Sequence, residues 1–133
     1  MVLVDANVLL DIATRDPIWC GWSSARLAEV YEHEETAINP VIYTELIPAY
    51  AATDELDTIL VPPNRFKRLT LPYSAAAPAA RAFAAYRKAA GAKTSPLPDF
   101  FIGAHAEAEG LTLLTRDAAR YRTYFPAVKL ICP

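Results

Sequence analysis

The sequence has little cysteine and no long apolar run, and each absence excludes a class of protein. Its two cysteines, Cys20 and Cys132, are too few for a disulfide framework and lack the paired spacing of a zinc site, so we expect free or buried thiols. No apolar run approaches the roughly 18 residues of a membrane span, and Asp5 stands where a signal peptide would carry its basic and apolar regions. We therefore expect a cytoplasmic protein with no membrane partner.

Acidic residues are absent from the stretch 58–98, although the formal net charge of the chain is only −2. Residues 1–57 hold eleven acids against two bases, a net charge of −9, whereas residues 58–133 hold four acids against eleven bases, a net charge of +7. The basic stretch suits an electrostatic footprint for a polyanion, and solvated helix faces would explain it equally well.

The 133 residues, with 53% hydrophobic content, predict one domain over 1–133 with a single core. Short apolar segments alternate with helical patterns. Strands are expected at 2–5, 36–39, 64–71, 111–115 and 128–131, and helices at 6–12, 19–35, 40–48, 53–61, 74–93 and 99–110. This alternation predicts an α/β fold with a parallel or mixed sheet and helices on both faces.

Local signals place several helix ends. Asn39 followed by Pro40 is typical of a helix start, with asparagine as the N-cap and proline in the first turn. Pro48 must bend or end that helix because it has no backbone donor. Gly110 is expected to end the helix that begins near Asp99.

Four acids stand where ordinary surface placement explains them poorly: Asp5, Glu45, Asp99 and Asp117. Asp5 and Asp117 each follow a predicted buried strand, so both would emerge at the carboxyl edge of a parallel sheet. Glu45 projects from a mainly apolar helix face. Asp99 lies in the first turn of a helix, where complementing the helix dipole would by itself explain an acid.

Carboxylates that converge on one crevice raise one another's pKa unless a cation lies between them. Oxygen ligands without a supporting set of cysteine and histidine favour Mg²⁺ or Mn²⁺ over zinc. The four acids together therefore predict a magnesium site, in which Asp5 is a metal ligand.

Three segments carry a resemblance to a known family: VLVDANVLLD at 2–11, PVIYTELI at 40–47 and LPDFFIGAHAEAEGLTLLTRD at 97–117. In these segments and in total length, the chain resembles the PIN-domain ribonucleases, and most closely the VapC-like toxins of bacterial toxin–antitoxin pairs. The last segment is the most specific, because its acid, small-residue helix, strand and second acid follow the family's order and spacing. Pro48, soon after Glu45, and Phe100-Phe101, after Asp99, depart mildly from the family's pattern.

The resemblance implies a three-layer α/β/α fold with a central, mainly parallel sheet, and Mg²⁺- or Mn²⁺-dependent cleavage of RNA. Asp5, Glu45, Asp99 and Asp117 match the family's acidic quartet, which would be both catalytic and metal-binding, while Asn7 and Thr115 match positions that support it. Metal-activated water would leave 5′-phosphate and 3′-hydroxyl ends.

The expected partners are an RNA substrate, a cognate antitoxin and a second copy of the chain in a homodimer. Candidate RNA contacts are Arg87, Lys88 and Arg116, and candidate antitoxin contacts are Trp19 and Trp22.

Alternatives remain open for single residues and for the whole chain. Asn7 could cap the first helix, and Thr115 could simply favour a strand. His105 lies off the helix face of Asp99, so a buried or exposed structural histidine is expected. A haloacid-dehalogenase-like phosphatase would need a second aspartate where Asn7 stands, and a non-catalytic PIN-like module would keep the acidic pocket but only bind RNA or protein.

Overall fold

The computed structural model describes residues 1–60, 66–89, 92 and 97–133 of the chain. Five short strands form one sheet: β1 (Val2–Val4), β2 (Thr36–Ile38), β3 (Phe66–Arg68), β4 (Thr112–Leu114) and β5 (Leu130–Ile131). Their order is β3-β2-β1-β4-β5, and every neighbouring pair is parallel. All three residues of the central strand β1 are buried, as its unbroken apolar sequence predicts.

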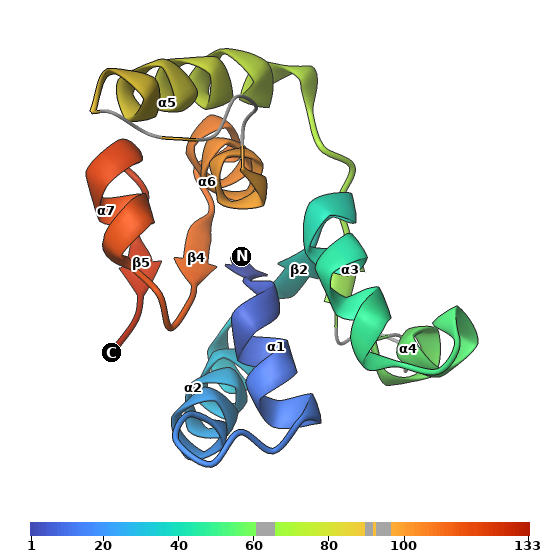
Figure 1. The fold of residues 1–133 in the computed structure, drawn as a ribbon. Coiled ribbons are helices and arrows are strands. Elements are labelled where there is room, and N and C mark those ends of the chain that lie inside the picture. The colour runs from blue at the N-terminus through green and yellow to red at the C-terminus, as the bar shows by residue number, and fades with distance from the viewer. Residues whose placement is uncertain (61–65, 90–91, 93–96) are drawn as a thin grey trace.

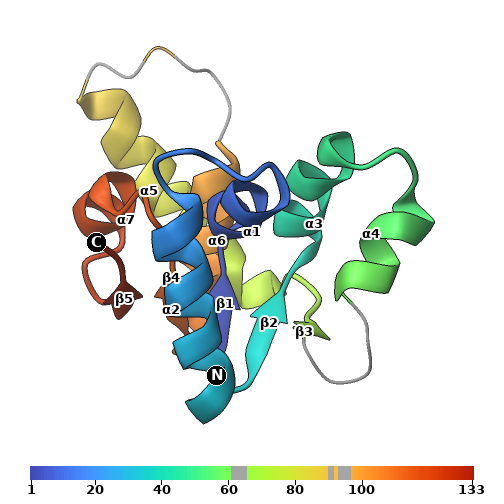
Figure 2. The same ribbon diagram turned by 90° about the horizontal axis from the view of Figure 1, so that it is seen from below.

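Helices cover both faces of the sheet. Their bounds are α1 (Ala6–Ala13), α2 (Cys20–His33), α3 (Pro40–Leu46), α4 (Thr53–Leu60), α5 (Ala76–Lys88), α6 (Pro98–Glu109) and α7 (Ala119–Tyr124), with 3₁₀ turns η1 (Ile47–Ala49) and η2 (Tyr73–Ala75). Figure 1 shows α1 and α2 on one side of the strands and α5 and α6 on the other. Figure 2, turned by 90°, shows α1 and α2 in front of the sheet with α6 behind it. The predicted three-layer α/β/α fold with a parallel sheet is confirmed.

The predicted helix ends agree with the local hydrogen bonds. The side chain of Asn39 accepts a hydrogen bond from the Ile42 backbone N–H at 3.0 Å, with Pro40 in the first turn of α3. Helix α3 ends at Leu46, and the chain passes through the turn η1, which contains Pro48. Gly110 adopts a left-handed φ of 62° after α6, a conformation that glycine takes without strain.

Helix α5 packs the half-buried rings of Phe83 and Tyr86 against the core, on the same face as the fully buried Ala79 and Ala82. Its expected end near residue 93 lies outside the described residues. Helix α7 was not predicted at all. Among the described residues, no helix is long and apolar enough to cross a membrane.

The packing of α6 on the C-terminal segment depends on a glycine. A Cβ at Gly103 would lie 2.4 Å from the ring of Phe125, which is completely buried. We expect Gly103→Ala to lower the free energy of unfolding by about 1–3 kcal/mol through overpacking. Gly21→Ala is the control, because a Cβ there would meet nothing within 4 Å and alanine favours the helix. Thermal denaturation of both variants measures the difference, and equal stability would contradict this packing.

Candidate active site at the carboxyl edge of the sheet

Asp5 lies at the carboxyl end of the central strand β1 and is only 3% exposed. Its Oδ2 atom accepts three side-chain hydrogen bonds: from Thr115 Oγ1 at 2.8 Å, Asn7 Nδ2 at 3.0 Å and Tyr121 Oη at 3.1 Å. These donors come from α1, from the loop after β4 and from α7. They compensate the buried carboxylate and fix its orientation.

Asn7 and Thr115 connect Asp5 to the loop that carries Asp117. Asn7 donates from Nδ2 to Thr115 Oγ1 at 3.0 Å, and its Oδ1 accepts the backbone N–H of Arg116 at 3.2 Å. Thr115 Oγ1 in turn accepts the backbone N–H of Asp117 at 3.2 Å. The N-cap of α1 is Asp5, so the side chain of Asn7 does not cap that helix.

The acids influence one another across the site. Burial raises the pKa of Asp5 to about 6, and the nearby Asp99 adds to this rise. Burial also raises the pKa of Glu45 to about 7, with further contributions from Asp5 and Asp99. For Asp99, burial raises the pKa and Asp117 raises it further. Side chains from the ends of β1 and β4 and from helices α3 and α6 thus influence one another at one site. The carboxyl-edge argument predicts this for Asp5 and Asp117, which follow the neighbouring parallel strands β1 and β4.

Two residues that the sequence reasoning missed contact the acidic cluster, which consists of Asp5, Glu45, Asp99 and Asp117. Arg120 Nη1 lies 2.9 Å from Asp99 Oδ2, and this cation opposes the rise in the pKa of Asp99. Tyr121 is 1% exposed, and burial together with the charge of Asp5 raises its pKa, so its hydroxyl stays protonated and donates. Both lie on α7, three and four residues after Asp117.

The donor set fits a hard divalent cation. Its ligand atoms are carboxylate oxygens, which Mg²⁺ and Mn²⁺ prefer, and the raised pKa values of Asp5 and Glu45 report charge that a cation would relieve. As the described side chains stand, no group of three acidic, histidine or cysteine side chains is arranged to hold an ion. Arg120 is the cation that Asp99 contacts in this arrangement.

Residues 2–126, nearly the whole chain, match the family model of the PIN domain. This chain belongs to the PIN domain family. The comparison with curated proteins gave no match.

Several solved structures share this fold, among them a toxin–antitoxin complex from Klebsiella pneumoniae. VapBC2 from Rickettsia felis, bound to a DNA fragment from its promoter, aligns with a TM-score of 0.74 at 16% identity, covering 100% of this PIN domain and 99% of that chain. VapBC-1 from nontypeable Haemophilus influenzae aligns with a TM-score of 0.74 at 13% identity, covering 99% and 98%. FitAcB from Neisseria gonorrhoeae aligns with a TM-score of 0.66 at 22% identity, covering 98% and 96%. At these identities the likeness shows a shared fold.

A second buried acid of the PIN domain, Asp11, lies on α1. It is 3% exposed, accepts a hydrogen bond from Ser23 Oγ at 2.8 Å, and pairs with Arg116 Nε at 2.9 Å. The guanidinium of Arg116 also lies over the ring of Trp19, 5.6 Å from its centroid. Sequence reasoning missed Asp11, although its spacing of four residues from Asn7 on α1 could have found it.

The predicted partner contacts lie at different places on the PIN domain. Arg87 and Lys88 are exposed at the end of α5, whereas Arg116 is held by Asp11. Trp19 and Trp22 are half-buried and meet edge to face, with ring centroids 6.2 Å apart. These RNA and antitoxin roles stay predictions.

His105 is structural, as expected. It is 1% exposed, its Nδ1 lies 3.1 Å from Asn39 Nδ2, and burial lowers its pKa. Because Asn39 also caps α3, this contact connects α6, which carries Asp99, to α3, which carries Glu45.

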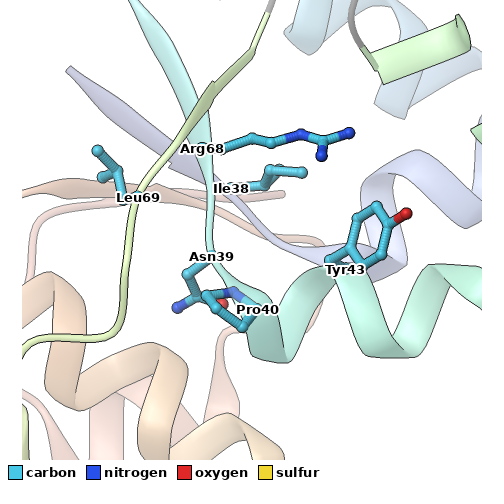
Figure 3. A pocket seen from close by; sticks show the side chains of 6 residues that line it. All are labelled: Ile38, Asn39, Pro40, Tyr43, Arg68 and Leu69. Carbon is cyan, nitrogen blue, oxygen red and sulfur yellow. The ribbon is translucent and has the colours of Figure 1, made fainter. Parts of the chain in front are cut away.

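A pocket of about 180 Å³ lies at the carboxyl ends of β2 and β3, lined by Ile38, Asn39, Pro40, Tyr43, Arg68 and Leu69 (Figure 3). None of the acidic quartet lines it. Arg68 pairs with Asp57 and lies over the Tyr43 ring, and the Tyr43 hydroxyl donates to Asp57 at 2.9 Å. The charge of Arg68 is therefore balanced by Asp57, and the pocket is separate from the acidic site.

The cluster predicts a stability that depends on pH. Glu45 has a pKa of about 7 in the folded chain, above its ordinary value of 4.5, so the folded state binds more protons than the unfolded state between these values. The free energy of unfolding without metal should therefore fall as pH rises from about 5 to 8. Glu45→Gln should remove much of this slope and raise stability at pH 8 by about 1–2 kcal/mol, a figure discounted for partial exposure. Chemical denaturation at both pH values measures it, and an unchanged slope would contradict the raised pKa of Glu45.

Proposed function

We propose that this PIN domain is a Mg²⁺- or Mn²⁺-dependent endoribonuclease and the toxin of a toxin–antitoxin pair, with residues 1–133 forming one nuclease domain. The observation that carries the proposal is the acidic cluster. Burial and mutual repulsion raise the pKa of Asp5, Glu45 and Asp99 together at the carboxyl edge of the sheet. Groups perturbed in this way by burial and like charge are typical of functional sites.

The residues of the quartet would hold the cation: Asp5, Glu45, Asp99 and Asp117. When bound, it would lower the pKa of a water and neutralise charge on the scissile phosphate. Asn7, Thr115 and Tyr121 hold the Asp5 carboxylate in one orientation through their hydrogen bonds. Arg120, partly exposed beside Asp99, is available to contact a phosphate oxygen of the RNA.

Cleavage of long single-stranded RNA tests the activity. The protein should produce fragments with 5′-phosphate ends in Mn²⁺ or Mg²⁺ and none in EDTA. The alternative function, a PIN-like module that only binds RNA or protein, predicts RNA binding without fragments in any metal.

The antitoxin proposal rests on the acidic cluster and on the structures that share the fold, which include VapBC and FitAB bound to DNA. We propose that a cognate antitoxin silences a homodimer of this chain. A cationic antitoxin side chain would enter the quartet, as Arg120 already pairs with Asp99, and an apolar anchor would contact Trp19 and Trp22.

Antitoxin and metal should then compete. The affinity of a cognate antitoxin peptide should fall as Mn²⁺ rises, because both need the same carboxylates and linkage makes the effect reciprocal. Calorimetric titration at several Mn²⁺ concentrations, with ionic strength constant, separates competition from screening. Affinity that does not change with Mn²⁺ would mean that the antitoxin blocks RNA access elsewhere.

A further inference from the structure

A cavity of about 290 Å³ opens beside the acidic cluster, between the last turn of α5 and helix α7. It is lined by Tyr86, Asp117, Ala119, Arg120, Thr123 and Tyr124. Figure 1 shows this end of α5 above α7, at the side of the molecule away from α3 and α4. Two of the lining residues connect the cavity directly to the acidic cluster: Asp117 belongs to the quartet, and Arg120 pairs with Asp99.

The aromatic walls of this cavity are held in place by a buried ring. Tyr86 and Tyr124 meet edge to face with centroids 6.3 Å apart, and they contact Phe100 at 5.5 Å and 5.4 Å. Phe100 is completely buried, so both tyrosines are ordered by packing while remaining half-exposed. Rings arranged in this way offer a surface on which a base can stack at small entropic cost.

The polar groups around the cavity suit a nucleotide. The guanidinium of Arg120 can contact a phosphate or a base, and Thr123, exposed on α7, keeps oxygen lone pairs while its hydroxyl donates to the Ala119 carbonyl at 2.9 Å. Arg87 and Lys88 follow Tyr86 directly and are exposed. The cavity is near the lower end of the roughly 300–1,000 Å³ of ligand pockets, a size for one nucleotide rather than a segment of folded protein.

From these observations we propose that the cavity between α5 and α7 binds one nucleotide of the single-stranded RNA, next to the phosphate that is cleaved. The base stacks on Tyr86 and Tyr124, and the flanking backbone passes Arg87 and Lys88. The proposal rests on the proposed nuclease function, which it deepens by naming the subsite where the substrate is held. Such a subsite favours single-stranded RNA, because a base paired in a helix cannot enter the cavity.

The test measures RNA binding apart from cleavage. Fluorescence anisotropy with labelled single-stranded oligo(A) and oligo(U) ribonucleotides is done in an Asp5→Asn background, so that the result does not depend on catalysis. Two substitutions alter residues that line the pocket: Thr123→Glu adds a negative charge, and Tyr86→Leu removes an aromatic ring.

Each change has a matched control on the same chain. Thr58 on α4 is exposed and donates to the Asp54 carbonyl at 2.8 Å, as Thr123 does to Ala119, so Thr58→Glu adds the same charge in the same setting elsewhere. Tyr73 is 100% exposed in η2, so Tyr73→Leu removes a tyrosine ring outside the pocket. Tyr86→Phe keeps the stacking ring of Tyr86.

We expect Thr123→Glu and Tyr86→Leu to weaken RNA binding roughly tenfold, and Tyr86→Phe and the two controls to change it by less than about twofold. If the Asp5→Asn protein binds RNA and Thr123→Glu binds equally well, the pocket is not the subsite, while the nuclease function stands. If the unsubstituted protein binds no RNA and forms no fragments in Mn²⁺, the proposed function fails and the pocket proposal fails with it. Weaker antitoxin binding with unchanged RNA binding would assign the cavity to a protein partner and overturn the proposal.

Discussion

Asp5→Asn is expected to reduce metal-dependent RNA cleavage by about a thousandfold or more, because removing one carboxylate from the quartet costs several kcal/mol of charge stabilisation in the transition state. The protein should stay folded. The asparagine side chain keeps an oxygen that can accept hydrogen bonds from Thr115 and Tyr121, and it no longer repels Asp99. Asp99→Asn and Asp117→Asn should also abolish cleavage.

The measurement is the rate of fragment formation in Mn²⁺, with thermal denaturation of each variant in EDTA. Asp54→Asn is the matched control, since Asp54 is an exposed acid in the first turn of α4, outside the acidic cluster. Full activity in Asp5→Asn would contradict the metal-site assignment. Loss of activity with a large loss of stability would instead show that Asp5 is needed for folding.

Arg116→Ala is expected to lower the free energy of unfolding by about 3 kcal/mol, the largest stability effect that we predict, because it leaves Asp11 buried without its cation. Asp11 is 3% exposed, whereas the side chain of Arg116 is 32% exposed, so water offsets part of the loss. The contact of Arg116 with the Trp19 ring would also be lost.

A double-mutant cycle with Asp11→Asn isolates this pair. The double variant should be more stable than Arg116→Ala alone, because the buried charge is gone and Ser23 can still donate to the asparagine oxygen. Chemical denaturation of the four proteins gives the coupling energy. Additive effects would show that Arg116 contributes through packing alone. A drop in RNA affinity larger than the loss of folded protein would support its predicted RNA contact.

Much of the fold could be read from local patterns. The run Val2–Val4 is apolar on both faces, as a central parallel strand must be, and Asn39 with Pro40 specified the start of α3. Helix α7 escaped prediction because Ala119–Tyr124 spans six residues, too few for a helical period to be recognised, and the helix is stabilised by burying Tyr121.

The chain by itself determined which chemistry is available, through acids placed after buried strands and on apolar helix faces, where an isolated charge is unfavourable. Only the tertiary structure decided which groups meet those acids. Tyr121 donates to Asp5 across 116 residues, and Arg116 pairs with Asp11 across 105. No periodicity or spacing encodes such pairs, because they depend on the register of β1 against β4 and on the packing of α7 beside them. The cavity between α5 and α7 has the same origin, since its tyrosines meet only where both helices pack on Phe100.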